Sequence, residues 1–210
     1  MPDVHNDGRR IEMGNRPSLR PGGPLTYMSY DLPWANVSNA PFRSFKHWVH
    51  EGGISTPLVV QWPSHMRQAT VSHAPCHVSD ILPTIMEVTG TRMSATVGER
   101  EVQTPDGESF APLLQGRHWT RDLPIAWEHE GNCAIRQGNL KLVRRFDQPW
   151  ELYDMEKDRT ELHDLAPRNA TLQKDLERRY DTWAHAAGVQ DWKLLVPRLL
   201  EAWAMDDVHG

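Results

Sequence analysis

The chain has 210 residues and a formal net charge of −5 at pH 7. This charge argues against a nucleic-acid partner, because phosphate binding needs clustered positive charge. It also contains no apolar run near the ~20 residues that a membrane span needs, so we expect no membrane partner. Its start lacks the charged, apolar and small-residue order of a secretory signal, which leaves the localisation open. Two cysteines permit at most one disulfide, and their spacing does not demand one.

Residues 1–33 are rich in glycine and proline, most densely between Arg16 and Pro24. Neither a helical nor a strand period is present there. We therefore expect residues 1–33 to form an extended or disordered arm.

The next segment places polar residues directly before a short apolar run. Lys46 and two histidines precede Glu51, and Gly52-Gly53 follow it. Leu58 to Trp62 then predict a strand buried on both faces. Because loops that lead into such strands often carry the sites of α/β enzymes, this loop is the first candidate site.

A helix is predicted near residues 80–89. Asp80 is its candidate cap and Gly90 its end. Its apolar face would consist of Ile81, Leu82, Ile85, Met86 and Val88. Residues 106–116 predict a loop that contains a short helix.

The last ninety residues predict an antiparallel sheet packed by a helix, which is an α+β arrangement. A strand is expected near residues 125–128, and a hairpin joins residues 133–137 to 140–144 through Gly138-Asn139. A further short strand is expected at residues 150–153. A helical stripe then follows Asn169, the candidate cap, and stops at Gly188; it consists of Leu172, Leu176, Tyr180, Trp183 and Ala187. Residues 192–203 predict another amphipathic helix, with Leu195, Leu199 and Trp203 on one side.

Three blocks of this sequence resemble the sulfatase family, in the family's order. The first is Asn-x-Pro-Phe-Arg-x-x-Lys-x-x-x-x-Glu-Gly-Gly-x-x-x-Pro, from Asn39 to Pro57. The second is the helix start from His77 to Thr84. The third runs from Trp127 to Leu165 and resembles the carboxy-terminal subdomain of arylsulfatases. The resemblance covers most of this chain and only the carboxy-terminal portion of a sulfatase.

This resemblance implies an α/β fold in three parts. After the arm of residues 1–33, residues 34–120 would form the carboxy-terminal part of an alkaline-phosphatase-like sulfatase domain. Residues 121–210 would form the small α+β subdomain. The implied activity is hydrolysis of sulfate esters, with Lys46 contacting the sulfate group.

The family's nucleophile is a formylglycine made from the first residue of Cys/Ser-x-Pro-x-Arg, and its metal is calcium. Neither Cys76 nor Cys133 has proline two residues later, and no serine fits the motif. The paired aspartates and the Asp-Asn-Gly segment that hold calcium have no counterpart. We therefore expect formylglycine and Ca²⁺ only in a complete enzyme, no metal site in this chain, and no activity from this chain alone.

Lys46 is the candidate catalytic residue, because a compact ammonium suits the charge that builds up as a sulfate ester breaks. His50 is a candidate substrate contact because it is close to Lys46 in the sequence, and His129 is another. Arg43 is expected to be structural, for example by pairing with Glu51.

Two other function classes remain open. The chain could be a non-catalytic binding module, or a subunit that complements a chain carrying the missing amino-terminal half. It could also be a divergent metal hydrolase that uses His47, His50 and Glu51.

Overall fold

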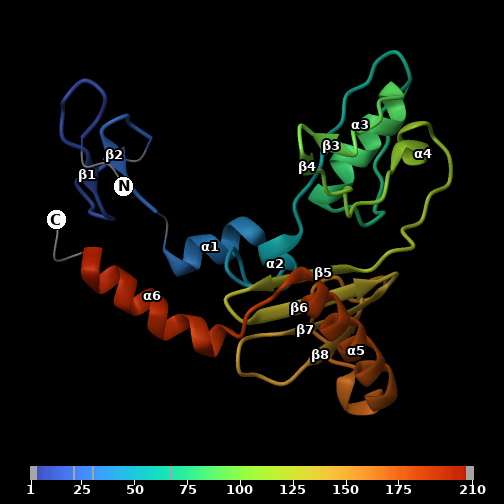
Figure 1. The fold of residues 1–210 in the computed structure, drawn as a ribbon. Helices are drawn as coiled ribbons and strands as arrows, with labels where there is room; N and C mark the ends of the chain where they lie inside the picture. Colours follow the sequence, from blue (N-terminus) through green and yellow to red (C-terminus); the bar gives the residue numbers. More distant parts are fainter. Residues whose placement is uncertain (1–3, 21, 30, 67, 207–210) are drawn as a thin grey trace.

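The computed structural model describes residues 4–20, 22–29, 31–66 and 68–206. At its centre lies a four-stranded antiparallel sheet in the order β5-β6-β7-β8 (Figure 1). The strands are β5 (Ile125–His129), β6 (Asn132–Gln137), β7 (Leu140–Arg144) and β8 (Glu151–Asp154). The sequence therefore predicted all four strands to within one or two residues.

Tight turns, which contain residues in the left-handed backbone conformation, connect β5 to β6 and β6 to β7. Glu130 and Gly131 have φ of 52° and 79°, the pattern of a two-residue type I′ hairpin loop. Gly138 follows β6 with φ of 58° and opens the turn into β7. These turns fix the register, in which His129 pairs with Asn132 and Gln137 with Leu140.

Alternate residues of the sheet enter two separate cores, one on each face. The first core contains Cys133, Ile135, Leu142 and Leu152 and is covered by α5 (Ala170–Ala187). Its helix contributes the buried side chains of Leu176 and Tyr180, as the predicted stripe requires. Gly188, at φ of 72°, ends α5 as predicted. Asn169 stands at the cap position, but its side chain bonds the carbonyl of Leu165 and caps no amide of α5.

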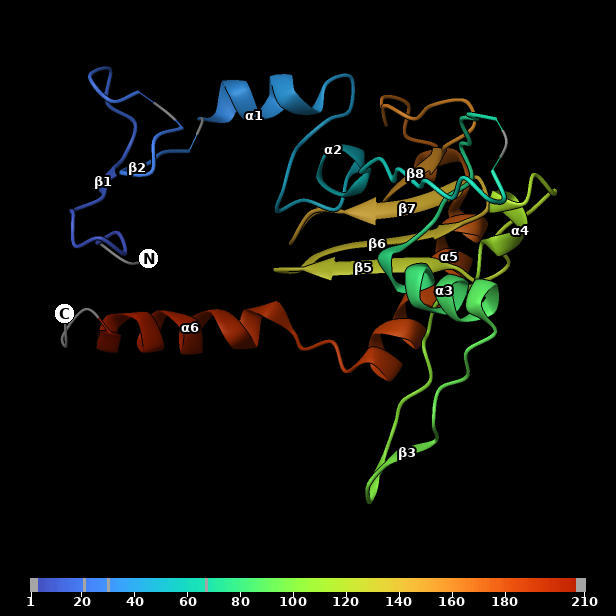
Figure 2. The same ribbon diagram turned by 90° about the horizontal axis from the view of Figure 1, so that it is seen from above.

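The second core contains Ala134, Val143, Tyr153 and Met155 together with Val49 of the candidate site loop. The loop continues into α2 (Glu51–Ile54), which lies over the face of the sheet opposite α5. Figure 2 shows this layering from above. The sheet therefore supports the candidate site directly.

A smaller unit contains the turn η1 (Val78–Asp80), α3 (Ile81–Thr89) and α4 (Ala111–Leu114). Asp80 lies fully buried and accepts hydrogen bonds from the amides of His77 and Glu108, at 2.7 and 2.9 Å. It also pairs with Arg121. Asp80 therefore joins three segments instead of capping α3 through its side chain. Gly90 ends α3 as predicted, at φ of 67°.

The predicted strand at residues 58–62 is wrong for this structure, and the apolar face of α3 is open. Residues 58–62 form no strand, and Val59 is 89% exposed. Helix α3 is present, but its predicted apolar face is largely exposed at Ile81, Leu82 and Ile85, and Thr84 is its buried residue. In both places the apolar pattern is present and nothing in the described part of the chain covers it.

The remaining elements are short or peripheral. In the arm, β1 (Glu12–Met13) and β2 (Thr26–Tyr27) pair in parallel, although the sequence predicted no strand there. The sequence also missed α1 (Leu32–Asn39), whose cap is Asp31, and the hairpin of β3 (Thr96–Val97) and β4 (Arg100–Glu101). A turn η2 (Ala166–Arg168) precedes α5. Residues 1–3, 21 and 30 of the predicted arm lie outside the described ranges.

The last helix, α6 (Trp192–Asp206), extends the predicted segment 192–203 by three residues and projects away from the sheet (Figures 1 and 2). The side chain of Trp203, part of its predicted apolar side, lies outside the description. Within the described ranges, none of the helices is both long enough and apolar enough to cross a membrane.

Candidate functional site

The tip of the site loop is a tight turn that presents Lys46 and His47 to solvent. The amide of Trp48 donates to the carbonyl of Phe45 at 3.2 Å, which closes the turn. His47 has φ of 103°, in the region that the third position of a type II turn requires. Lys46 is exposed beside it. The turn therefore holds its ammonium-bearing side chain out from the protein surface.

Side chains on both sides fix this turn. The rings of Phe45 and Trp48 pack edge to face with centroids 4.6 Å apart. Arg145 donates to the hydroxyl of Ser44 at 3.1 Å, and its guanidinium carbon lies 5.4 Å from the Trp48 ring centroid. A second cationic group consequently lies alongside the turn that carries Lys46.

The double glycine is required by close backbone approach. The amide of Gly52 donates to the carbonyl of Arg43 at 3.0 Å, which folds α2 back against the loop. A Cβ on Gly52 would clash with the backbone of Ser44, and one on Gly53 with the backbone of Trp48. Both glycines lie at φ values that other residues can adopt, so the constraint here is space rather than backbone angle.

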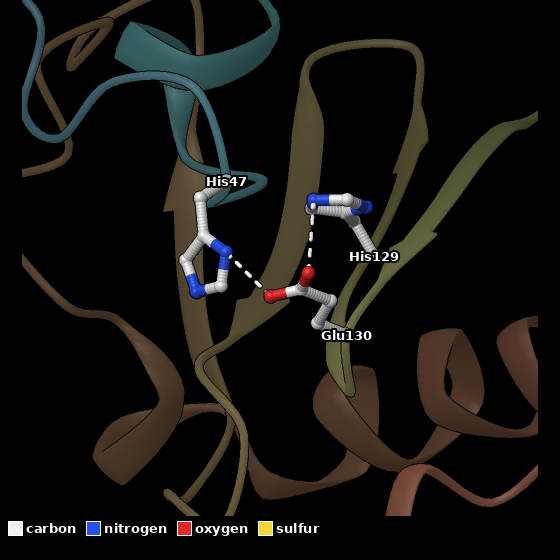
Figure 3. Close-up of side chains that lie close together, drawn as sticks. All are labelled: His47, His129 and Glu130. Atoms are coloured by element: carbon white, nitrogen blue, oxygen red, sulfur yellow. Dashed lines mark ion pairs between the residues drawn. The ribbon is translucent and has the colours of Figure 1, made fainter. Parts of the chain in front are cut away.

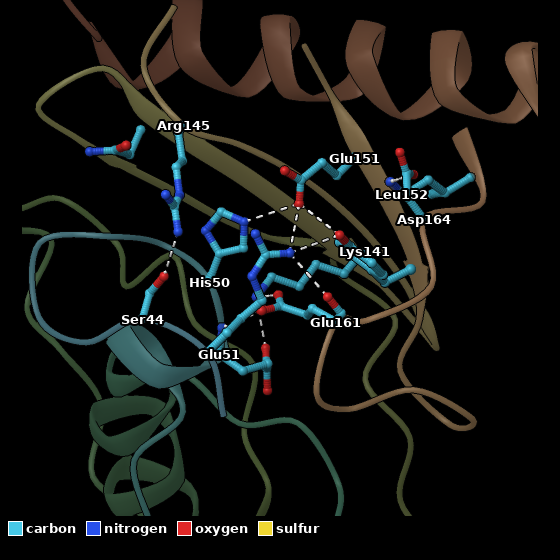
Figure 4. A network of polar contacts seen from close by, with 12 residues as sticks. Ser44, His50, Glu51, Lys141, Arg145, Glu151, Leu152, Glu161 and Asp164 are labelled. Carbon is cyan, nitrogen blue, oxygen red and sulfur yellow. Dashed lines mark hydrogen bonds and ion pairs between the residues drawn. The ribbon is translucent and has the colours of Figure 1, made fainter. Parts of the chain in front are cut away.

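Beneath the loop, a buried lysine holds two buried glutamates (Figure 4). The ammonium of Lys141, on β7, lies 2.8 Å from Oε1 of Glu51 and 2.7 Å from Oε1 of Glu161. The Lys141 and Glu161 side chains are 0% exposed, and Glu51 is 5% exposed. Glu161 also accepts from the amide of Glu51 at 3.0 Å. The start of α2 is thus tied to the sheet by charge-assisted bonds.

A second set of polar contacts centres on Glu151 of β8. Arg43 donates to the Glu151 carboxylate at 3.1 Å, to the Tyr153 hydroxyl at 3.0 Å and to the carbonyl of Glu161 at 3.0 Å. The Tyr153 hydroxyl donates to the same carboxylate at 2.7 Å, and His50 Nε2 lies 3.3 Å from it.

These contacts set the ionisation state of the Glu151 carboxyl group. Burial acts to raise the pKa of Glu151, but the hydrogen bonds of His50 and Tyr153 and the charge of Arg43 outweigh it and hold that pKa at about 2. Burial, and then the bond to Glu151, raise the pKa of Tyr153. Glu151 is therefore a carboxylate at neutral pH that holds the loop in place.

A third group lies at the exposed edge of the loop (Figure 3). His47 Nδ1 is 2.7 Å from a carboxylate oxygen of Glu130, and His129 Nε2 is 4.0 Å from the other. His47 comes from the site loop, while the other two residues come from the end of β5 and its turn. The turn into β6 thus places its side chains beside the candidate loop.

The structure exposes some of the predicted site residues and buries others. Lys46 and His129 face solvent as a substrate contact must. His50 does not: its side chain is 0% exposed and is held against Glu151. Arg43 is structural as predicted, although its partner is Glu151 and not Glu51.

The predicted ligand set of His47, His50 and Glu51 is not assembled. His50 and Glu51 are committed to Glu151 and Lys141 below the loop, whereas His47 lies above it with Glu130. The sequence missed Lys141, Glu151 and Glu161 because charged residues in strands and loops are usually exposed. The approach of both carboxylates to one lysine requires the folded sheet.

A family model described as N-sulphoglucosamine sulphohydrolase, C-terminal, matches residues 42–185. This match begins at the site loop and ends within α5, so it contains the whole sheet and both polar networks. It crosses residue 120, where the sequence predicted a boundary between two parts.

Sulfatases of other organisms are similar to this chain. A sulfatase of Schizosaccharomyces pombe is 29% identical over 171 residues, covering 78% of this chain and 31% of the relative. An ulvan-active sulfatase of Formosa agariphila is 26% identical over 186 residues, covering 69% of this chain and 36% of the relative. The chain therefore spans roughly a third of the length of the curated relatives that it matches.

The solved structure of Ps i-CgsB has a TM-score of 0.57 and 26% identity, and the likeness covers 70% of this chain and 32% of that chain. The likeness confirms the predicted fold class, a portion of a sulfatase domain followed by a small antiparallel sheet with a helix. The chain belongs to the sulfatase family, and it corresponds to the carboxy-terminal portion of the family's members.

Proposed function

We propose that this chain forms the carboxy-terminal part of a sulfate-ester hydrolase and supplies Lys46 to the substrate's sulfate group. The observation that carries the proposal is the placement of Lys46 at the exposed tip of a turn fixed from below by buried ion pairs. Its ammonium would balance the negative charge on the sulfate oxygens as the ester bond breaks. Fixing the turn in advance lowers the cost of orienting this charge.

The chain does not itself fit the family's nucleophile or calcium. Neither Cys76 nor Cys133 is followed by the x-Pro-x-Arg that formylglycine formation uses. Calcium takes six to eight oxygen ligands, whereas the one close group of candidate ligands among the described residues offers two imidazoles and one carboxylate. We therefore assign both groups to the remainder of a sulfatase domain and derive no step from them here.

His50 and His129 receive different roles in this proposal. His50 is a positioning residue, because its contact with Glu151 ties the end of the loop to β8. His129 faces solvent at the same edge as His47 and stays the candidate second contact with the substrate. The substrate class is a sulfate ester, and the identity of the ester is left to the rest of the domain.

Two exposed apolar surfaces favour association with that remainder. Leu58 and Val59 follow α2, and Ile81, Leu82 and Ile85 line α3; each is at least 38% exposed. Apolar side chains gathered in this way mark surfaces that another element covers. We propose that the amino-terminal part of a sulfatase domain covers them, carried in the same polypeptide or in a complementing chain.

The test measures turnover of 4-nitrophenyl sulfate. We expect no turnover by the chain alone, and turnover once it is combined with a segment that carries Cys-x-Pro-x-Arg and the calcium ligands. In the active combination, Lys46→Ala should lower kcat by about 10²- to 10³-fold, the usual loss for one charge-stabilising group. Lys174→Ala is the matched control, since Lys174 is exposed on α5 on the opposite face of the sheet.

Two results would contradict the proposal. Full turnover by Lys46→Ala would remove Lys46 from the site. Turnover by the chain alone would mean that its own residues provide a nucleophile.

A further inference from the structure

We propose that His47, His129 and Glu130 bind a divalent transition-metal ion, with zinc the preferred ion. The proposal does not depend on sulfate-ester hydrolysis. Figure 3 shows the three side chains converging between the site loop and the turn after β5.

The separations between the candidate ligand atoms suit one small ion. One nitrogen of each histidine and one oxygen of Glu130 all lie within 4.8 Å of one another. Ligand atoms held about 2.0–2.1 Å from a tetrahedral zinc ion lie roughly 3.3 Å apart. His47 Nδ1 lies 2.7 Å from one Glu130 oxygen and His129 Nε2 lies 4.0 Å from the other, so the carboxylate lies between the two rings. Binding of one ion by all three ligand atoms requires these exposed side chains to rotate toward it.

The donor set selects the class of metal. Two imidazole nitrogens and one carboxylate oxygen form the ligand set of open zinc sites, which keep a position for water. Calcium and magnesium prefer oxygen ligands throughout. The side chains of His47, His129 and Glu130 are 43%, 52% and 38% exposed, so water and metal can reach the ligand atoms.

The backbone beneath these ligands is preorganised. The amide nitrogen of the Asn132 side chain donates to the carbonyl of His129 at 2.9 Å and to that of His47 at 3.4 Å. Asn132 is itself buried, so one fixed side chain ties together the two turns that carry the ligands.

Two tight turns carry two of the three ligands. His47 and Glu130 have φ of 103° and 52°, values that non-glycine residues adopt at some cost. These are the values of the type II turn and of the hairpin loop in which the two residues stand. The two turns bring both side chains toward the same point. Stacking alone does not account for this, because the His47 and His129 rings meet edge to face with centroids 5.6 Å apart.

A metal at this site would change the role of His129. Its imidazole would bind the ion, and a substrate oxygen could then occupy the open position on the metal. The competing explanation for the cluster is simple pairing of the imidazoles with the Glu130 carboxylate without any metal.

The experiment titrates Co²⁺ into untagged, chelator-treated protein at about pH 7.5, where an ordinary imidazole is neutral and free to bind. We expect one equivalent of Co²⁺ to give the visible absorption bands of a four- or five-coordinate ion, and one equivalent of Zn²⁺ to abolish them. His129→Ala and Glu130→Gln should each raise the Kd for Co²⁺ by at least about tenfold. His47→Asn should do the same, and asparagine tolerates positive φ better than alanine.

His118→Ala is the matched control, because His118 is exposed and outside the cluster. It should bind Co²⁺ as the unaltered chain does. Circular dichroism of each metal-free variant checks folding, which we expect to be preserved because all three ligands are exposed. The proposal is overturned if no visible bands appear at millimolar Co²⁺, or if the bands persist unchanged in the three ligand variants.

Discussion

Replacing Lys141 by methionine tests the buried network beneath the site loop. Methionine keeps most of the apolar stem and removes only the ammonium. Glu51 and Glu161, which lie 2.8 and 2.7 Å from that ammonium, would then face each other without a cation. Removing one partner of a buried ion pair typically costs about 3–5 kcal/mol, because the remaining charge stays desolvated. Two carboxylates are left here, so we expect Lys141→Met to reach the upper part of that range.

The assay is urea unfolding followed by circular dichroism. Lys193→Met is the control, since Lys193 pairs with Asp147 at the same 2.8 Å distance but with side chains 60% and 67% exposed. Exposed pairs contribute about 0–1 kcal/mol, so the control should hardly change the free energy of unfolding. Equal losses in the two variants would refute the reasoning that burial sets the cost.

A third variant keeps the test informative if Lys141→Met does not fold. Combining it with Glu51→Gln and Glu161→Gln removes all three charges, and glutamine can still accept the bond from the Glu51 amide. Replacing a whole buried ion cluster by apolar residues of similar volume is often neutral or stabilising, and an uncharged glutamine costs less to bury than an unpaired carboxylate. We therefore expect the triple variant to be more stable than Lys141→Met alone. A triple variant that is less stable would show that side-chain shape, and not charge, governs the network.

Two further predictions concern pH and the exposed apolar surfaces. The folded pKa of Glu151, about 2, lies below its ordinary value of 4.5, so its contribution to stability is complete above about pH 4.5 and is lost as pH falls toward 2. That contribution is on the order of 3 kcal/mol. Urea midpoints measured between about pH 3 and 6 should fall more steeply with acid for the unaltered chain than for Glu151→Gln, and parallel curves would contradict this. Val59→Ser and Ile85→Ser should each change the free energy of unfolding by less than about 0.5 kcal/mol while reducing self-association in size-exclusion chromatography. A loss above about 2 kcal/mol would mean that these side chains are packed after all.

The sheet and its helices were predictable because their signals are local. Gly138-Asn139 between two strand-like runs indicates a hairpin, and the stripe through Leu176 and Tyr180 indicates a helix with one buried face. Gly90 and Gly188 mark helix ends, where the left-handed conformation favours glycine. None of these signals needs information from elsewhere in the chain.

The wrong prediction of a strand at residues 58–62 concerns what covers an element. The run from Leu58 to Trp62 has the composition of a buried strand, but a strand needs neighbours, and the described part of this chain offers none. The same holds for the exposed apolar face of α3. A hydrophobic pattern indicates which surface of an element can be buried. It does not indicate which other segment covers that surface.

The candidate site was predictable only in part. The motif located Lys46 and the double glycine, whereas the clustering of His47 with His129 and Glu130 depends on the fold. One local signal was available: Glu130-Gly131 between two strand-like runs suits a two-residue hairpin loop, which fixes where both neighbouring side chains lie. It does not indicate that the site loop packs beside that hairpin.

The nature of the supporting contacts bears on what the loop does. Apolar packing between Val49 and the sheet tolerates small displacements, since dispersion depends weakly on direction. The contacts of Arg43 do not, because one guanidinium nitrogen meets a carboxylate, a hydroxyl and a carbonyl at once. Shifting the loop by about 1 Å would break several charge-assisted bonds together. A loop held by such directional bonds has a fixed turn, and under the proposed function this turn would place the charge of Lys46 against one group of a substrate.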